Sequence, residues 1–154
     1  MEGLNANAGM LTDFEVLDLL QTRGAASDHM ACLGKVSVSE CKVYDYLTQK
    51  AACNQAREGI QSFKLRCEEF MKRHGKRKLA KSEILNVINF RPSSYVELYA
   101  VLPLDDCFKM DADGNSPDAD EFLKIVCDLL SPPPTKPEQE GAEEEDEMDQ
   151  DDGL

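Results

Sequence analysis

The sequence lacks the features that mark membrane-spanning and secreted proteins. No stretch approaches the roughly 20 consecutive apolar residues that cross a bilayer. The first residues, MEGLNANAGM, contain neither the basic region nor the apolar core of a secretory signal. We therefore expect an intracellular protein.

The sequence also lacks the ligand spacing of a structural zinc site. Its six cysteines lie 9, 12, 14, 40 and 20 residues apart, and only two histidines, His29 and His74, accompany them. Structural zinc sites need close ligand pairs such as C-x-x-C on a tight turn, and this spacing supplies none. We expect six free thiols, several of them at apolar helix positions.

One acidic loop resembles the start of a calcium-binding loop. It reads DADGN and begins at Asp111, but in that register Ser116 occupies the glycine position and Phe122 the position of the bidentate glutamate. A register that places Gly114 correctly puts Lys109 at the first ligand position. We therefore predict a turn-rich acidic loop without a metal, and we disfavour a calcium-responsive regulatory protein.

Catalytic motifs are missing as well. The sequence contains no G-x-S-x-G, no P-loop and no glycine-rich turn after a strand, and both histidines have polar or basic neighbours. We expect a protein without catalytic residues of its own and without a cofactor.

Charge is abundant but unevenly distributed. The 154 residues carry a formal net charge of −13, and residues 135–154 hold ten acidic residues against one lysine, a charge of −9. The remaining −4 is ordinary for a soluble domain. Apart from Leu154, every Leu, Ile, Val and Phe lies in the first 130 residues. We predict one core there, a flexible N-terminus over 1–10, and a Pro-rich, then acidic, disordered tail over 132–154.

Helical periodicity dominates the chain between these ends, and no segment alternates convincingly with period two. Thr12 with Glu15, and Ser37 with Glu40, fit capping boxes at helix starts. The fold class is therefore predicted to be all-α. The expected helices cover about residues 12–23, 38–51, 55–74, 82–90, 95–102 and 117–130.

The first of these helices has more apolar residues than one buried stripe requires. We predict that one of its faces packs on this chain and that another contacts a partner protein. The candidate partner contacts are Phe14, Val16, Leu17, Leu19 and Leu20.

A single basic run, residues 72–81, connects the third and fourth expected helices. Lys76, Arg77 and Lys78 could contact nucleic-acid phosphates, which would make binding salt-dependent. The alternative is a solvated connector that the acidic tail visits. We favour the connector because no aromatic residue is interleaved for base stacking.

Residues 78–99, KLAKSEILNVINFRPSSYVELY, resemble the small stalk subunits of eukaryotic and archaeal RNA polymerases. The first helix, LTDFEVLDLL, is also similar to the first helix of that family, and the resemblance extends over about residues 10–130. The residues that match the family pattern are Leu79, Lys81, Glu83, Asn89, Arg91, Pro92, Val96, Glu97 and Leu98.

This resemblance implies a helical bundle of the helicase-and-RNase-D C-terminal (HRDC-like) type over 38–131, with a tip helix over 11–24 that packs against the larger stalk subunit. Together these form the helical stalk-subunit domain, 11–131. In the family the stalk engages initiation factors, lies near emerging RNA and carries no polymerisation chemistry.

The resemblance is closest to the RNA polymerase III member, because the first helix stands near the N-terminus and the C-terminal end is acidic. A nuclear protein that supports transcription initiation of small RNA genes is then implied. The alternatives are the RNA polymerase II counterpart, which has a longer leader, and a free-standing helical module that binds nucleic acid.

Three positions within the motif have local structural interpretations. Ala80 stands where the family usually has threonine, so the helix either loses about 1 kcal/mol of N-cap stabilisation or is capped later by Ser82. Pro92 is predicted to end the same helix. Arg91 could cap the carbonyls of that helix or face a partner or phosphate, and we favour the capping role.

Overall fold

The computed structural model describes residues 9–135, and every regular element in that range is a helix. The predicted all-α class is therefore confirmed. The acidic part of the expected tail, 136–154, and most of the expected flexible N-terminus lie outside the described residues. The elements are α1 (Asp13–Arg23), α2 (Val38–Leu47), the 3-10 helix η1 (Ala51–Asn54), α3 (Arg57–Arg73), α4 (Lys81–Phe90), α5 (Tyr95–Val101), α6 (Leu104–Cys107) and α7 (Pro117–Leu129).

The helix starts form through the caps that the sequence predicts. The Thr12 hydroxyl accepts from the Glu15 amide at 3.2 Å, and the Glu15 carboxylate accepts from the Thr12 amide at 3.1 Å. Ser37 and Glu40 make the same reciprocal pair at the start of α2. Gly24, in the left-handed region with φ 104°, ends α1.

Helix α4 begins with only half of such a box. Ala80 occupies the N-cap position and has no side-chain acceptor, whereas the Glu83 carboxylate still accepts from the Ala80 amide at 3.0 Å. The helix starts at Lys81, so the later start capped by Ser82 is not observed. One amide of the first turn therefore lacks the side-chain partner that a threonine would supply.

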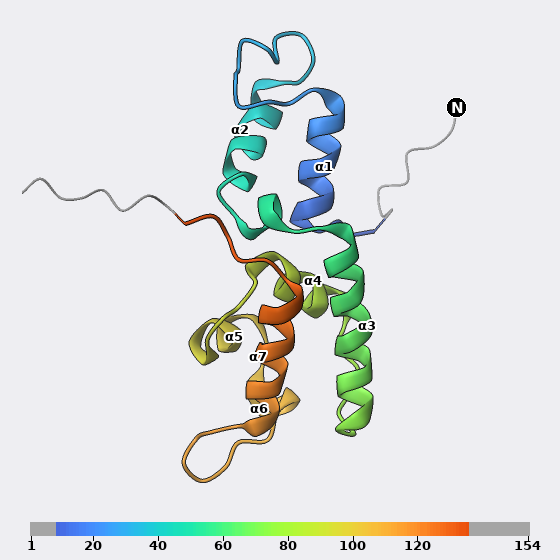
Figure 1. Ribbon diagram of the computed structural model, residues 1–154, viewed down its shortest axis with the longest axis vertical. Coiled ribbons are helices and arrows are strands. Elements are labelled where there is room, and N and C mark those ends of the chain that lie inside the picture. The colour runs from blue at the N-terminus through green and yellow to red at the C-terminus, as the bar shows by residue number, and fades with distance from the viewer. Residues whose placement is uncertain (1–8, 136–154) are drawn as a thin grey trace, which may run out of the picture.

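Helices α3 to α7 form the larger group, the bundle, in which α3 and α7 lie side by side (Figure 1). Four phenylalanines, Phe63, Phe70, Phe108 and Phe122, meet at its centre with ring centroids 5.4–6.4 Å apart. A Cβ atom on Gly59 would lie 2.8 Å from the Leu129 carbonyl oxygen. The glycine costs α3 some intrinsic helix stability, and in return it lets the two helices approach closely.

Helices α1 and α2 with η1 form a second, smaller group, the tip, at the other end of the molecule (Figure 1). Its own cluster of buried side chains comprises Leu17, Leu20, Ala25, Tyr44, Leu47 and Ala52. The expectation of one core is therefore wrong, and the buried clusters divide near η1 rather than at residue 38. Helix α2, which we expected in the bundle, packs on α1 instead, and an ion pair of 2.8 Å between Arg23 and Glu40 joins the two.

Polar and aromatic contacts fix the tip to the bundle. The Asn89 side-chain oxygen on α4 accepts from the Asp13 amide at 2.9 Å, which satisfies one of the unpaired N–H groups at the start of α1. The buried Gln55 side chain donates to the Ile88 carbonyl at 2.7 Å. Phe14 packs against the bundle cluster. The start of α1 is therefore held by residues that are distant in sequence.

Candidate functional site

The five predicted partner contacts on α1 divide between this chain's own core and its surface. Leu17 and Leu20 are buried in the tip cluster, and Val16 is partly buried against it. Phe14 packs on the bundle, whereas Leu19 remains 51% exposed. Most of the apolar excess of α1 is explained within this chain, and Leu19 is the one of the five that is free to contact a partner.

Exposed apolar side chains nevertheless concentrate in the tip. Six of the thirteen large exposed hydrophobic residues in the described range lie on α1, on α2 or in the loop between them. Scattered single exposures are normal, but a concentration on one small subdomain indicates an interaction surface. We define the apolar tip surface as Leu19, Met30, Leu33, Val38, Val43 and Tyr46.

The loop between α1 and α2 supplies Met30 and Leu33, the two residues of this surface that lie outside a helix. Met30 is 74% exposed and Leu33 is 70% exposed. The loop is held in place because buried Cys32 accepts from the Ala26 amide at 3.0 Å and because the His29 Nε2 lies 2.8 Å from the Asp45 carboxylate on α2. The sequence did not indicate Met30 and Leu33 as contact residues, because a loop has no periodicity from which to infer an exposed face.

Two of the three predicted phosphate contacts in the basic run are paired with this chain's own acids. The Lys76 amine lies 2.9 Å from Asp118 with its side chain only 9% exposed, and Arg77 makes two hydrogen bonds of 2.9 Å to Glu83. These contacts lower the pKa of the Asp118 carboxyl, through the Lys76 hydrogen bond, and of the Glu83 carboxyl, through the Arg77 hydrogen bond. Lys78 is the most exposed of the three predicted phosphate contacts. The arrangement favours the connector over a nucleic-acid patch.

Most of the residues that match the stalk-subunit pattern have structural roles. Leu79 and Pro92 are buried in the bundle. Glu97 accepts from the Ser93 amide at 2.6 Å and from its hydroxyl at 2.9 Å, and the amide contact lowers the pKa of the Glu97 carboxyl. Val96 is 81% exposed, so the fold does not require its apolar side chain.

Arg91 caps a helix, but not the helix that we expected. Its Nε donates to the Leu130 carbonyl at 3.0 Å and its Nη2 to the Cys127 carbonyl at 3.4 Å, so it satisfies the end of α7 rather than of α4. The residue itself ends α4 in the left-handed region with φ 46°, which is costly for a side chain with a Cβ. The guanidinium therefore connects the end of α4, where the Arg91 backbone is strained, to the end of α7.

We expect Arg91→Ala to lower the free energy of unfolding by about 1–3 kcal/mol, because the α7 carbonyls lose a charged donor while the strain remains. Arg91→Gly loses the same donor but relieves the strain, so it should be more stable than Arg91→Ala by about 1 kcal/mol. Urea unfolding followed by circular dichroism measures both. Equal stability of the two variants would show that the left-handed backbone stores no strain.

Comparison with known proteins identifies the family of this chain. The family model described as RNA polymerase Rpb4 matches residues 10–126, a range that includes all of α1 to α6 and most of α7. The chain belongs to the RNA polymerase Rpb4 family. It is thus an RNA polymerase stalk subunit, of a family that is non-catalytic and associates with the polymerase and a partner stalk subunit.

Neither the curated proteins nor the solved structures include a match to this Rpb4-family chain. The more specific expectation of an HRDC-like bundle therefore stays a prediction. The all-helical architecture itself is observed throughout the described range.

The acidic loop of this Rpb4-family member is closed by its own backbone. The Asp111 carboxylate accepts from the Asp113 amide at 3.0 Å and from the Asn115 amide at 2.8 Å, as in a turn. Within residues 9–135, no group of three or more His, Cys, Asp or Glu side chains is placed to hold a metal ion.

The six cysteines are free thiols, as predicted. Burial raises the pKa of the Cys67 thiol to about 11, which keeps it protonated and unreactive at neutral pH. Among the described residues, no helix combines the length and apolar character needed to span a membrane.

Proposed function

We propose that this chain is the small stalk subunit of RNA polymerase III, acting in the nucleus with the larger stalk subunit to support initiation at small RNA genes. The equivalent subunit of RNA polymerase II is the alternative. The resemblance of residues 78–99 to the stalk-subunit family supports either assignment, and the acidic C-terminal segment favours the first. Initiation factors and the polymerase core are the further partners that this assignment implies.

The observation that carries the proposal is the apolar tip surface. A monomeric domain gains nothing from exposing six large apolar side chains on two short helices and their loop. Burying each such side chain against a partner stabilises a complex by about 1.5–3 kcal/mol. Several together are enough for a stable heterodimer of ordinary interface size. We therefore propose that the larger stalk subunit covers this surface, with Leu19 as the contact from α1.

A free-standing nucleic-acid-binding module is the weaker alternative. It would use the basic run, yet Lys76 and Arg77 are held by Asp118 and Glu83. Within that run, Lys78 is the cation we propose for any weak phosphate contact, since its side chain is 79% exposed. Such a contact would have to be made within the assembled polymerase.

Co-expression with the larger stalk subunits of RNA polymerases II and III tests the proposal. We expect the full chain to co-purify with the RNA polymerase III partner through affinity and size-exclusion steps as a 1:1 complex. Exclusive association with the RNA polymerase II partner would select the alternative. A monodisperse monomer in both co-expressions would refute both assignments.

A further inference from the structure

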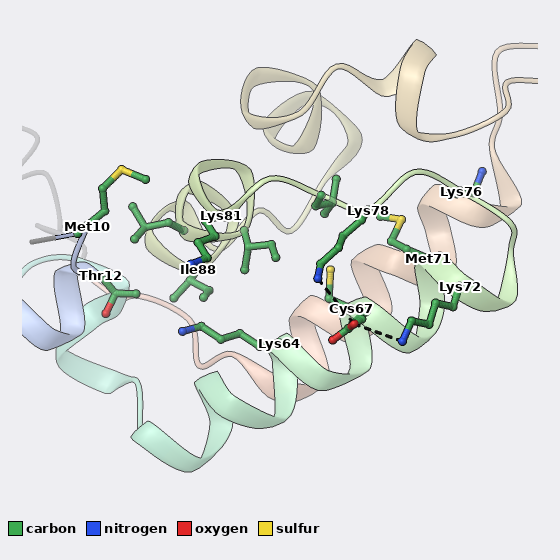
Figure 2. Close-up of a pocket in the computed structure, with 15 residues that line it drawn as sticks. Met10, Thr12, Lys64, Cys67, Met71, Lys72, Lys76, Lys78, Lys81 and Ile88 are labelled. Carbon is green, nitrogen blue, oxygen red and sulfur yellow. Dashed lines mark ion pairs between the residues drawn. The ribbon is translucent and has the colours of Figure 1, made fainter. Parts of the chain in front are cut away.

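A groove of about 520 Å³ lies between α3 and α4, and the segment before α1 closes one end of it (Figure 2). Its floor is apolar. The side chains that form it come from α3, α4, the connector and the start of the described chain. They are Met10, Cys67, Met71, Leu79, Ile84, Leu85 and Ile88.

The rim of the groove is cationic. It carries five lysines, Lys64, Lys72, Lys76, Lys78 and Lys81, and one acid, Glu68. Figure 2 shows Lys64 and Lys72 on α3 and Lys81 on α4, so the charges come from both walls. Four of these lysines belong to the basic run that the sequence shows. The fifth, Lys64, was not predicted from the sequence, and the fold brings it to the groove from the middle of α3.

The one acid on the rim does not balance these lysines. Glu68 lies 3.3 Å from Lys72 and 3.9 Å from Lys78, and Lys76 is paired with Asp118 outside the groove. Lys64 and Lys81 form no ion pair with any residue in the range 9–135. An apolar floor with an excess of positive charge suits an extended segment that is acidic and carries a few apolar side chains.

We propose that the acidic C-terminal segment of this chain, residues 136–154, docks in the groove between α3 and α4. This segment has ten acids and one lysine, and Met148 and Leu154 supply apolar side chains for the floor. Residues 1–8, the other terminal segment of the sequence, hold a single acid and match the charge of the groove poorly. The proposal holds whichever polymerase the chain serves.

The segment is long enough to reach the groove. The chain leaves the fold beside η1, where the Asn54 side chain donates to the Pro132 carbonyl at 3.0 Å. Nineteen extended residues span about 60 Å, whereas a domain of this size has a radius of gyration of about 14 Å. Because the segment is tethered, its effective concentration at the groove is of millimolar order, so individually weak ion pairs suffice.

Carbodiimide cross-linking of the full chain tests this docking, since the reagent joins a lysine amine to a carboxylate in direct contact without a spacer. We expect mass spectrometry to find residues 138–152 linked to Lys64, Lys78 and Lys81. Exposed lysines elsewhere, Lys42 and Lys124, should link about tenfold less, and the groove links should disappear near 1 M salt, where screening acts within about 3 Å.

Matched variants and isotope labelling distinguish other occupants. Lys64→Glu with Lys81→Glu should reduce the remaining link, between Lys78 and the acidic segment, about tenfold. Lys42→Glu with Lys124→Glu makes the same change in charge and should not reduce it. All four side chains are exposed, so the fold should persist. Links spread evenly over all exposed lysines would overturn the proposal. Links from Glu2, or links between ¹⁴N and ¹⁵N chains in a mixture, would assign the groove to the N-terminus or to a second copy instead.

Discussion

Replacing Phe122 with alanine is expected to lower the free energy of unfolding by about 3–5 kcal/mol. Phe122 lies on α7 with no exposed surface, and its ring centroid is 5.4 Å from Phe108, 5.8 Å from Phe70 and 6.2 Å from Phe63. Removing it leaves a cavity that three rings on two other segments cannot fill together. Because domains are stable by only about 5–15 kcal/mol, this one change removes a large fraction of the total.

Phe90→Ala is the matched control, since it deletes the same ring at a position that is 72% exposed. We expect it to change the unfolding free energy by less than about 0.5 kcal/mol. Urea unfolding followed by circular dichroism compares the two variants. If both variants had the same small effect, α7 would not pack its Phe122 face against α3 as the structure has it.

The local elements of this fold are readable from the sequence because their signals are local. The caps at Thr12, Ser37 and Ser94 each lie three residues before the glutamate whose amide they accept from, and all three form. Periodicity also predicts that α2 has an apolar face, with Tyr44 and Leu47. It does not predict which element covers that face, so assigning α2 to the bundle rather than the tip was wrong.

The contacts between distant segments were not predictable in the same way. Asn89 and Arg91 stand out in the stalk-subunit pattern, yet their partners, the Asp13 amide and the carbonyls of Cys127 and Leu130, are more than 30 residues away. A single sequence carries no signal for such pairs, because any backbone group is an equally good donor or acceptor. The structure assigns these residues to joining helices, and this role is sufficient to explain why the two positions have these side chains.

The interaction surface could not be predicted fully from the sequence either. The apolar excess of α1 predicted that one of its faces packs on this chain and another contacts a partner, but two of its leucines are used within this chain. Most of the exposed apolar side chains lie instead in the loop and on α2. The sequence does not show which of them remain uncovered, because a loop has no periodicity and the apolar residues of a half-buried helix can lie on its covered or its uncovered side. This result moves the predicted interface from α1 alone to the whole tip.

The double variant Met30→Asp with Leu33→Asp is expected to weaken binding to the larger stalk subunit by about 30-fold to 1,000-fold, equivalent to about 2–4 kcal/mol. Both side chains lie on the loop of the apolar tip surface and are at least 70% exposed. Two carboxylates buried there in a complex would lose hydration without gaining a partner. The isolated chain should keep its stability because neither residue packs in a buried cluster.

The control for this variant is Leu65→Asp with Met110→Asp, which replaces the same two residue types at positions that are 64% and 42% exposed on the bundle. Isothermal titration with the purified partner compares the two, after thermal melts have shown that both fold. If the partner covers the tip, only the tip variant loses affinity, because the control adds the same charges outside the interface. Equal loss in both variants would mean that the added negative charge weakens binding regardless of position. Loss in the control alone would place the partner on the bundle, leaving the exposed apolar side chains of the tip to contact another part of the polymerase.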